Sequence, residues 1–360
     1  MIRLRLVLLV LLSLVTAGPA RPAGPSPTSE LDAIATTAVA RNKFMGAVLV
    51  VRDGAVLLDR GYGSASLELE VPNTPATRFR IGSITKQFTA AAILLLEERG
   101  RLRLADPVAR HVPEVPAAWS QITLYQLLTH TSGIRNLTSL PDFRTWARLP
   151  QTPRQAVERL RDLPLDFPPG EKFAYSNSNY LLLGLVIERV SGRDYAAFLH
   201  DNVLDPLGLR DTDVDNNTDL VPRRAAGHAF QFGEYLRAPY SDMTVPHAAG
   251  AMYSTTHDLR RWIEGLLAGR LLTPESVSRM ITPEKGGYAL GLQVSLSPRK
   301  VIRHGGSIAG FSAFLAHYPD DRLTVVVLSN VMGPTSEPLA RQLAAAVLAD
   351  RAAGTRPPAP

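Results

Sequence analysis

The alternation of apolar and polar positions predicts strands at both ends of the chain. The segments 46–51 and 55–62 flank an Asp-Gly turn at 53–54, a pattern typical of a β-hairpin. Near the C-terminus the same period predicts four strands, over 288–295, 300–303, 311–318 and 323–330. Helical spacing over 31–42 and 337–350 predicts a helix at each end. We therefore expect an α/β (α+β) fold, in which one antiparallel sheet built from both termini is flanked by the N- and C-terminal helices.

The middle of the chain has helical periodicity instead. An apolar run from Ile84 to Leu96 is hydrophobic nearly all round, as expected for a buried central helix, and it stops before Gly100. Thr152-Pro153-Arg154-Gln155 is a capping box with proline at the first helical position. Further helices are predicted over 180–190, 194–203 and 258–267.

These segments predict one domain over residues 30–351. Its sheet is expected near 44–66 and 286–330, and the residues between, near 67–280, form a mostly helical insertion.

The first twenty residues have the features of a secretory signal peptide. Arg3 and Arg5 make a positive start, residues 6–15 are apolar except for Ser13, and small residues follow. The apolar stretch is shorter than the roughly 20 residues that a membrane span needs, although a retained signal anchor is the alternative. We expect residues 1–20 to be removed, 21–29 to be a flexible leader and 352–360 to be a disordered tail. The mature protein is then exported, periplasmic or secreted, without a stable membrane anchor.

Composition and charge narrow the classes of function. The 360 residues are 45% hydrophobic and 20% charged, which is typical of a globular protein with a sizeable core. The net charge is +6, but the basic residues are scattered, so no nucleic-acid partner is expected. The chain has no cysteine, which excludes disulfides, a thiolate metal site and a cysteine nucleophile.

Ser83 and Lys86 lie where a loop enters the predicted central helix. Residues three apart share a helix face, so the lysine amine can reach the serine hydroxyl. A serine is a weak nucleophile until a base takes its proton, and burial among apolar residues lowers a lysine pKa enough for that role. Taken alone, Ser83 is also compatible with an ordinary helix N-cap. The same spacing recurs at Ser297 and Lys300, but there proline follows the serine and the pair lies between strands.

Two further segments carry candidate chemistry. Tyr175-Ser176-Asn177 is the only Tyr-x-Asn in the chain; a phenolate can act as a base, and an amide can hydrogen-bond a substrate carbonyl. His304-Gly305-Gly306-Ser307 closes a predicted strand, where glycines would let a substrate lie against the strand edge and the Ser307 N–H would face an oxyanion. Each segment has a plainer interpretation as a turn.

Together and in this order, the three segments resemble the serine β-lactamase and penicillin-binding protein superfamily, which uses Ser-x-x-Lys, Ser/Tyr-x-Asn and Lys/His-x-Gly. The tyrosine and histidine forms resemble the branch that holds class C β-lactamases, D-alanyl-D-alanine carboxypeptidases, D-aminopeptidases and related esterases. The resemblance extends from about Gly46 to Asn330 and includes other stretches, at 79–88, 127–133, 169–171 and 249–255.

The resemblance implies a role for each site residue. Ser83 is the acylated nucleophile, Lys86 and Tyr175 share the acid–base work, and Asn177 orients the scissile group. The N–H groups of Ser83 and Ser307 form the oxyanion hole, and His304 and Gly306 complete the substrate-binding strand. Which of Lys86 and Tyr175 takes the serine proton is left open, because the two titrate as a coupled pair.

At His304-Gly305 the chain departs from the pattern. The peptidases and lactamases of the superfamily typically have Lys and then Thr or Ser, a fixed cation and a hydroxyl for the substrate carboxylate. Here glycine supplies no hydroxyl, and an unperturbed histidine is a cation only below pH ~6.5. We expect His304 to be a conditional anchor, so that neutral esters react faster than β-lactams and carboxylate substrates gain as the pH falls.

The other histidines have plainer interpretations. His130 is expected to be a structural hydrogen-bonding residue beside the site, and no histidine has metal-ligand spacing. We therefore expect no metal and no cofactor.

The sequence thus predicts an exported serine hydrolase that forms an acyl-enzyme on Ser83. Its partners are small-molecule esters, D-amino-acid amides or peptides, or β-lactams, with cell-wall peptides among the candidates. The alternative is a non-catalytic or slowly deacylating sensor that binds penicillin or peptidoglycan, and turnover distinguishes the two.

Overall fold

The computed structural model describes residues 27–41 and 44–354. The predicted signal peptide lies outside these residues, as do 21–26 of the predicted leader and 355–360 of the predicted tail. Two expectations at the ends are wrong. Helix α1 (Pro27–Ala40) begins inside the predicted leader, with Pro27 and the acidic Glu30 suited to a first helical turn. Helix α12 (Ser336–Gly354) extends into the predicted tail, because the alanine-rich sequence after Asp350 continues to favour a helix.

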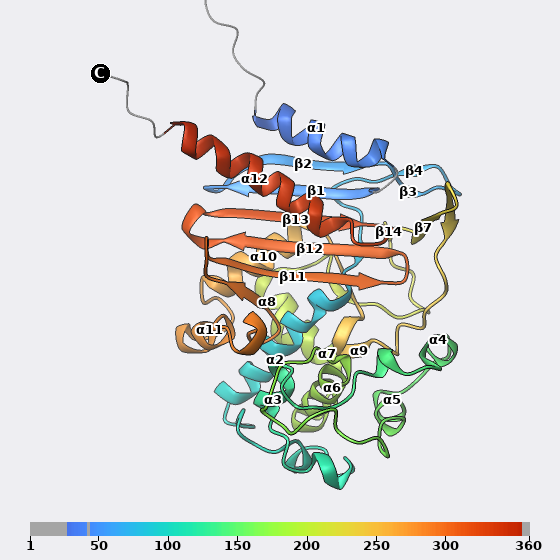
Figure 1. The fold of residues 1–360 in the computed structure, drawn as a ribbon, viewed down its shortest axis with the longest axis vertical. Coiled ribbons are helices and arrows are strands. Elements are labelled where there is room, and N and C mark those ends of the chain that lie inside the picture. The colour runs from blue at the N-terminus through green and yellow to red at the C-terminus, as the bar shows by residue number, and fades with distance from the viewer. Residues whose placement is uncertain (1–26, 42–43, 355–360) are drawn as a thin grey trace, which may run out of the picture.

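A six-stranded antiparallel sheet forms the upper part of the molecule in Figure 1. Its strands, in spatial order, are β10 (Gln293–Ser295), β11 (Val301–Ile308), β12 (Phe311–Tyr318), β13 (Leu323–Ser329), β1 (Gly46–Arg52) and β2 (Ala55–Tyr62). The N-terminal hairpin joins the C-terminal strands through the β1–β13 pair, in which Val48 lies opposite Val327. The prediction of one antiparallel sheet from both termini is confirmed.

Both faces of this sheet are covered. Successive side chains of a strand point to opposite faces, so on β13 Val325 and Val327 pack with α1 and α12 while Val326 and Leu328 join the main core. Figure 1 shows α1 and α12 on the outer side of the sheet and the other helices on its opposite side. Burial on two sides explains why β1 and β13 are apolar along almost their whole length.

The helices of the insertion pack around α2 (Thr85–Glu98). Every α2 residue from Thr85 to Leu96 is buried, as the apolar run predicted. Helices α6 (Asn177–Ser191) and α9 (His247–Gly250) lie directly against it. The remaining helices are α3 (Leu124–Leu128), α4 (Phe143–Trp146), α5 (Pro153–Glu158), α7 (Tyr195–Leu199), α8 (Asp205–Leu207), α10 (Thr256–Leu267) and α11 (Pro274–Met280). The predicted capping box begins α5.

Outside the six-stranded sheet, the described residues also form short strands that the periodicity did not predict. They are β3 (Ser64–Ser66), β4 (Val71–Pro72), β5 (Phe79–Arg80), β6 (Asp213–Val214), β7 (His228–Gln231), β8 (Glu234–Arg237) and β9 (Met252–Ser254), with β14 (Val331–Met332) pairing with β7. Strands of two to four residues are too short for a periodic pattern to reveal.

Two predicted strand boundaries near the site are wrong. Residues 288–292 form a turn before β10, because Gly291 (φ +74) packs so closely on α2 that a Cβ there would lie 2.6 Å from the Lys86 carbonyl oxygen. Strand β11 continues to Ile308, so His304-Gly305-Gly306-Ser307 lies within a strand rather than closing one.

No helix within the described ranges is both long and apolar enough to cross a bilayer.

Candidate active site

Ser83 lies in a short 3-10 turn, η1 (Gly82–Ile84), that leads directly into α2. The backbone of this turn packs directly against the backbone of β11. Gly82 has φ +51, and a Cβ there would lie 2.8 Å from Ser307 N; a Cβ at Gly306 would lie 1.9 Å from the Ile81 carbonyl oxygen and 3.2 Å from Ser83 N. Only glycine permits both approaches. They place Ser83 N beside the Gly306–Ser307 segment of β11.

Gly306 therefore has a different function from the one expected. The space left by its missing side chain is filled by the backbone of η1, and it is not left open for a substrate.

Lys86 is completely buried one helical turn after Ser83. Its Nζ lies 3.2 Å from Ser83 Oγ, 2.8 Å from Asn177 Oδ1 and 2.7 Å from the Ala249 carbonyl oxygen. Burial lowers the pKa of Lys86 well below its ordinary value. In the neutral amine, the amide and carbonyl oxygens take the two N–H groups, because both can only accept. The lone pair is then left for the Ser83 O–H.

Asn177 begins α6 and is held in one orientation by Asn136. The Asn136 Oδ1 accepts from Asn177 N at 3.1 Å and from Asn177 Nδ2 at 3.3 Å. The Asn177 Oδ1 is thereby directed at Lys86, and its side chain also lines the cavity described below.

Tyr175 lies next to Lys86, whose Nζ is 4.8 Å from the centre of the tyrosine ring. The phenol oxygen is shielded from solvent and makes no hydrogen bond of ordinary length to any described residue. Burial raises the pKa of Tyr175, and the neighbouring Ser83 hydroxyl offsets this only in part. Tyr175 is therefore a protonated phenol at neutral pH.

His130 packs against Tyr175 and hydrogen-bonds to Ser176, which is the structural role that the sequence predicted. Its ring centre lies 4.3 Å from that of Tyr175, and its Nδ1 accepts a hydrogen bond from Ser176 N at 3.2 Å. Burial lowers the pKa of His130 well below its ordinary value, so the ring is neutral.

His304 does not provide the conditional cation that we expected. Its side chain is buried, with Nδ1 2.6 Å from the Gly305 carbonyl oxygen and Nε2 3.0 Å from the Tyr288 hydroxyl. The carbonyl can only accept, so Nδ1 carries the proton and Nε2 accepts the Tyr288 O–H. Burial above all lowers the pKa of His304, to about 3. The ring is neutral at physiological pH, and His304 is not among the described residues that line the cavity.

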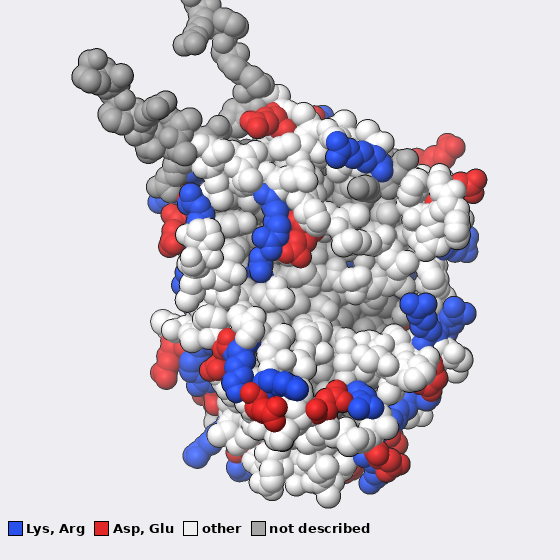
Figure 2. Space-filling model, viewed as in Figure 1, with Lys and Arg blue, Asp and Glu red and all other residues white. Residues whose placement is uncertain are grey.

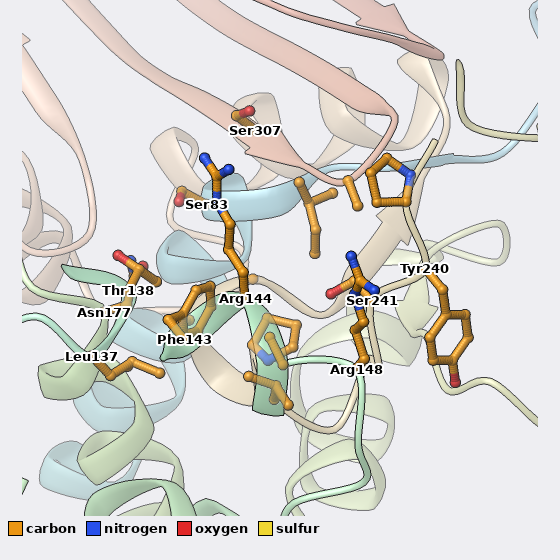
Figure 3. Close-up of a pocket in the computed structure, with 18 of the residues that line it drawn as sticks. Ser83, Leu137, Thr138, Phe143, Arg144, Arg148, Asn177, Tyr240, Ser241 and Ser307 are labelled. Atoms are coloured by element: carbon orange, nitrogen blue, oxygen red, sulfur yellow. The ribbon is translucent and has the colours of Figure 1, made fainter. Parts of the chain in front are cut away.

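A cavity of 570 Å³ opens beside Ser83. Figure 2 shows a recess between the sheet and the helical region, with a mostly white floor. In Figure 3, Ser83, Asn177 and Ser307 lie at one end of the cavity, and Tyr240 and Ser241 lie at the other. Leu137, Phe143 and Leu181 supply apolar lining, whereas Arg144 and Arg148 are the only charged side chains among the described lining residues.

Metal ligands are not assembled here. Over residues 27–41 and 44–354, no group of three or more His, Asp or Glu side chains is placed to hold an ion.

With this geometry in place, comparisons with known proteins identify the family. Residues 31–349 match the family described as Beta-lactamase, and the chain belongs to that family. Protein flp from Staphylococcus aureus (strain MRSA252) is 30% identical over 324 residues, which are 84% of this chain and 62% of flp. The chain thus spans less than two thirds of the length of that relative.

Solved structures agree on the fold. The octameric penicillin-binding protein homologue from Pyrococcus abyssi superposes with a TM-score of 0.79 at 28% identity, over 89% of this chain and 77% of that one. A D-stereospecific amidohydrolase from Streptomyces sp. has a TM-score of 0.76 at 28% identity, over 88% and 97%. The fold is therefore of the β-lactamase/transpeptidase type, as the resemblance implied.

Sequence reasoning missed several residues of the site. Asn136 lies 41 positions from the asparagine that it orients, and no local pattern connects the two. Ala249 contributes a backbone carbonyl, which its residue type does not reveal, although the stretch 249–255 matched the family. Arg144 and Arg148 are four residues apart around a short helix, a spacing that ordinary surface arginines share.

Proposed function

We propose that this chain is a serine hydrolase that forms an acyl-enzyme on Ser83. The observation that carries the proposal is the environment of Lys86: a buried amine with two obligate acceptors on its N–H groups and its lone pair left for the Ser83 hydroxyl, 3.2 Å away. Lys86 takes the hydroxyl proton, and Ser83 Oγ attacks the substrate carbonyl carbon. The N–H groups of Ser83 and Ser307 face the resulting oxyanion.

Tyr175 then acts as the acid. Burial keeps its phenol protonated, so it gives its proton to the leaving group as the acyl bond breaks and recovers a proton from Lys86. The Ser83 ester that remains is hydrolysed by water, which regenerates the serine and releases the acid. This assignment makes Lys86 the acylation base, a choice that the sequence left open.

The substrates proposed are small esters and D-amino-acid amides or peptides. The relation to a D-stereospecific amidohydrolase at 28% identity supports amides, and the partly apolar cavity accommodates an acyl group. A slowly deacylating penicillin-binding protein is the second candidate, which the relation to the Pyrococcus abyssi homologue favours.

A fluorophosphonate probe tests the nucleophile. Mass-spectrometric peptide mapping should place the adduct on Ser83, and Ser83→Ala should abolish both labelling and turnover. Ser297→Ala is the matched control, since Ser297 has the same lysine spacing but lies in the loop between β10 and β11. An adduct on Ser297, or labelling that survives Ser83→Ala, contradicts the proposal.

Pre-steady-state kinetics with 4-nitrophenyl esters, D-amino-acid amides and a chromogenic cephalosporin separates the two candidates. Repeated turnover identifies a hydrolase, whereas a stoichiometric burst without turnover on every substrate identifies the sensor.

We also propose that the protein is exported, on the basis of residues 1–20 alone. N-terminal sequencing of the protein from a bacterial host should find a mature start near Gly18 or Arg21. An intact Met1 in a membrane fraction would identify an anchor instead.

A further inference from the structure

Arg144 and Arg148 form a cationic pair on one wall of the cavity. Arg144 belongs to α4, Arg148 follows it, and both are exposed. Neither makes an ion pair or side-chain hydrogen bond with any residue between 27 and 354 that the structure describes. Neighbouring arginines are engaged: Arg159 lies 3.8 Å from Asp142 and stacks on Trp146, and Arg154 lies 3.8 Å from Glu114. The structure therefore leaves these two guanidinium groups available to a ligand.

The rest of the cavity offers no counter-charge. No Asp or Glu occurs among its described lining residues. The two arginines, in and just after α4, therefore face only uncharged polar and apolar side chains. A partly enclosed cleft with charge of one sign attracts ligands of the opposite sign. The guanidinium group presents paired donors that fit a carboxylate in a bidentate manner.

Arg144 is directed toward the reacting groups, and Arg148 is directed toward the other end of the same cavity. Figure 3 shows Arg144 reaching from α4 toward the end of the cavity that holds Ser83 and Ser307, and Arg148 reaching toward Ser241. One substrate that spans the cavity can therefore acylate Ser83 while its anionic group contacts this wall.

We propose that the cavity selects acyl substrates that carry a carboxylate, which Arg144 and Arg148 bind. The proposal rests on the proposed serine hydrolase function of Ser83 and specifies its substrate class. It reverses the preference for neutral esters expected from His304-Gly305, because the cation comes from α4 and not from β11. Arginine is charged at all accessible pH values, so this selectivity does not depend on a titrating histidine.

Matched substrates isolate the charge. The first pair is the 4-nitrophenyl monoester of glutaric acid and the 4-nitrophenyl ester of glutaramic acid, in which a carboxamide replaces the carboxylate. The second pair, 3-carboxyphenyl acetate and 3-carbamoylphenyl acetate, places the same difference in the leaving group. The two pairs tell whether the carboxylate belongs to the acyl part or to the leaving group.

The measured quantity is the ratio of kcat/KM for the carboxylate to that for the carboxamide. We expect a ratio above one in the wild type, and a fall of roughly 10- to 100-fold in at least one pair for the Arg144→Gln/Arg148→Gln double variant. Each single variant should lose part of this. Arg270→Gln removes an exposed arginine outside the cavity and should leave the ratio unchanged. Raising the ionic strength should lower the wild-type ratio and not that of the double variant.

A double variant that keeps the wild-type ratio in both pairs would overturn the proposal. The proposed function fails separately, if Ser83→Ala still hydrolyses the carboxamide esters.

Discussion

The two sides of the cavity differ in the charge state of their ionisable side chains. Around Ser83, the ionisable groups Lys86, Tyr175 and His304 are withdrawn from solvent, and burial shifts the pKa of each toward its neutral form. On the wall of α4, Arg144 and Arg148 are exposed and keep their charge. The comparison shows that burial keeps the proton-transfer groups neutral, whereas the groups that can bind a charged ligand are exposed to solvent.

The neutral side needs no counter-ion. A lysine paired with a carboxylate would keep its proton, whereas Lys86 is surrounded by an amide oxygen, a carbonyl oxygen and a hydroxyl. Desolvation is therefore the only cause that lowers its pKa.

The largest expected effect concerns the paired action of Lys86 and Tyr175. Lys86→Ala and Tyr175→Phe should each lower the acylation rate by roughly 10²- to 10⁴-fold, because each removes a proton-transfer group. The double variant should lose far less than the product of the two, since the groups act as one unit. Single-turnover kinetics of the four proteins measures this, with Lys300→Ala as the control outside the site. Fully multiplicative losses would mean that the two groups act independently.

The contact between η1 and β11 comes next. Gly306→Ala forces a Cβ to within 1.9 Å of the Ile81 carbonyl oxygen and must displace Ser83 N, so kcat should fall about 100-fold. Gly305→Ala is the matched control, because its Cβ would make only ordinary contacts, with the Phe314 ring at 3.5 Å and the Ala313 carbonyl oxygen at 3.8 Å. Circular dichroism confirms folding of both variants. Equal losses in the two would disprove the special closeness at Gly306.

The neutrality of His304 predicts a pH-dependent stability. Its folded pKa of about 3 lies below the unfolded value of ~6.5, so the unfolded chain binds the proton first and stability is lost as the pH falls below ~6.5. At pH ~5 this one residue lowers the free energy of unfolding by about 2 kcal/mol relative to neutral pH. Urea unfolding at two pH values should show a smaller acid loss in His304→Gln than in the wild type. An unchanged loss would place the acid sensitivity elsewhere.

The last prediction is that substrate selectivity does not change with pH. Between pH ~5.5 and ~8.5, the carboxylate-to-carboxamide ratio should be flat, because the buried His304 ring stays neutral there and guanidinium groups are charged throughout. The separate kcat/KM values should both fall on the acid side as Lys86 gains a proton. A ratio that rises toward pH ~6 would restore His304 as the conditional anchor.

Much of the fold was predictable because its signals are local. The hairpin at 53–54, the strands 311–318 and 323–330 and the apolar central helix follow from short-range periodicity, and the structure confirms them. The contact between Ser83 and Lys86 was predictable for the same reason, since three positions along a helix determine it.

The sequence by itself therefore determined the sheet built from both termini, the buried central helix and the pairing of a serine with a lysine one turn later. Only the tertiary structure decided that His304 is neutral, that Gly306 makes room for η1, and that Arg144 of α4 and Arg148 just after it face the same cavity as Ser83. These properties depend on burial and on contacts between segments tens to hundreds of residues apart. A residue's charge and available space are set by such neighbours, and the linear pattern does not contain them.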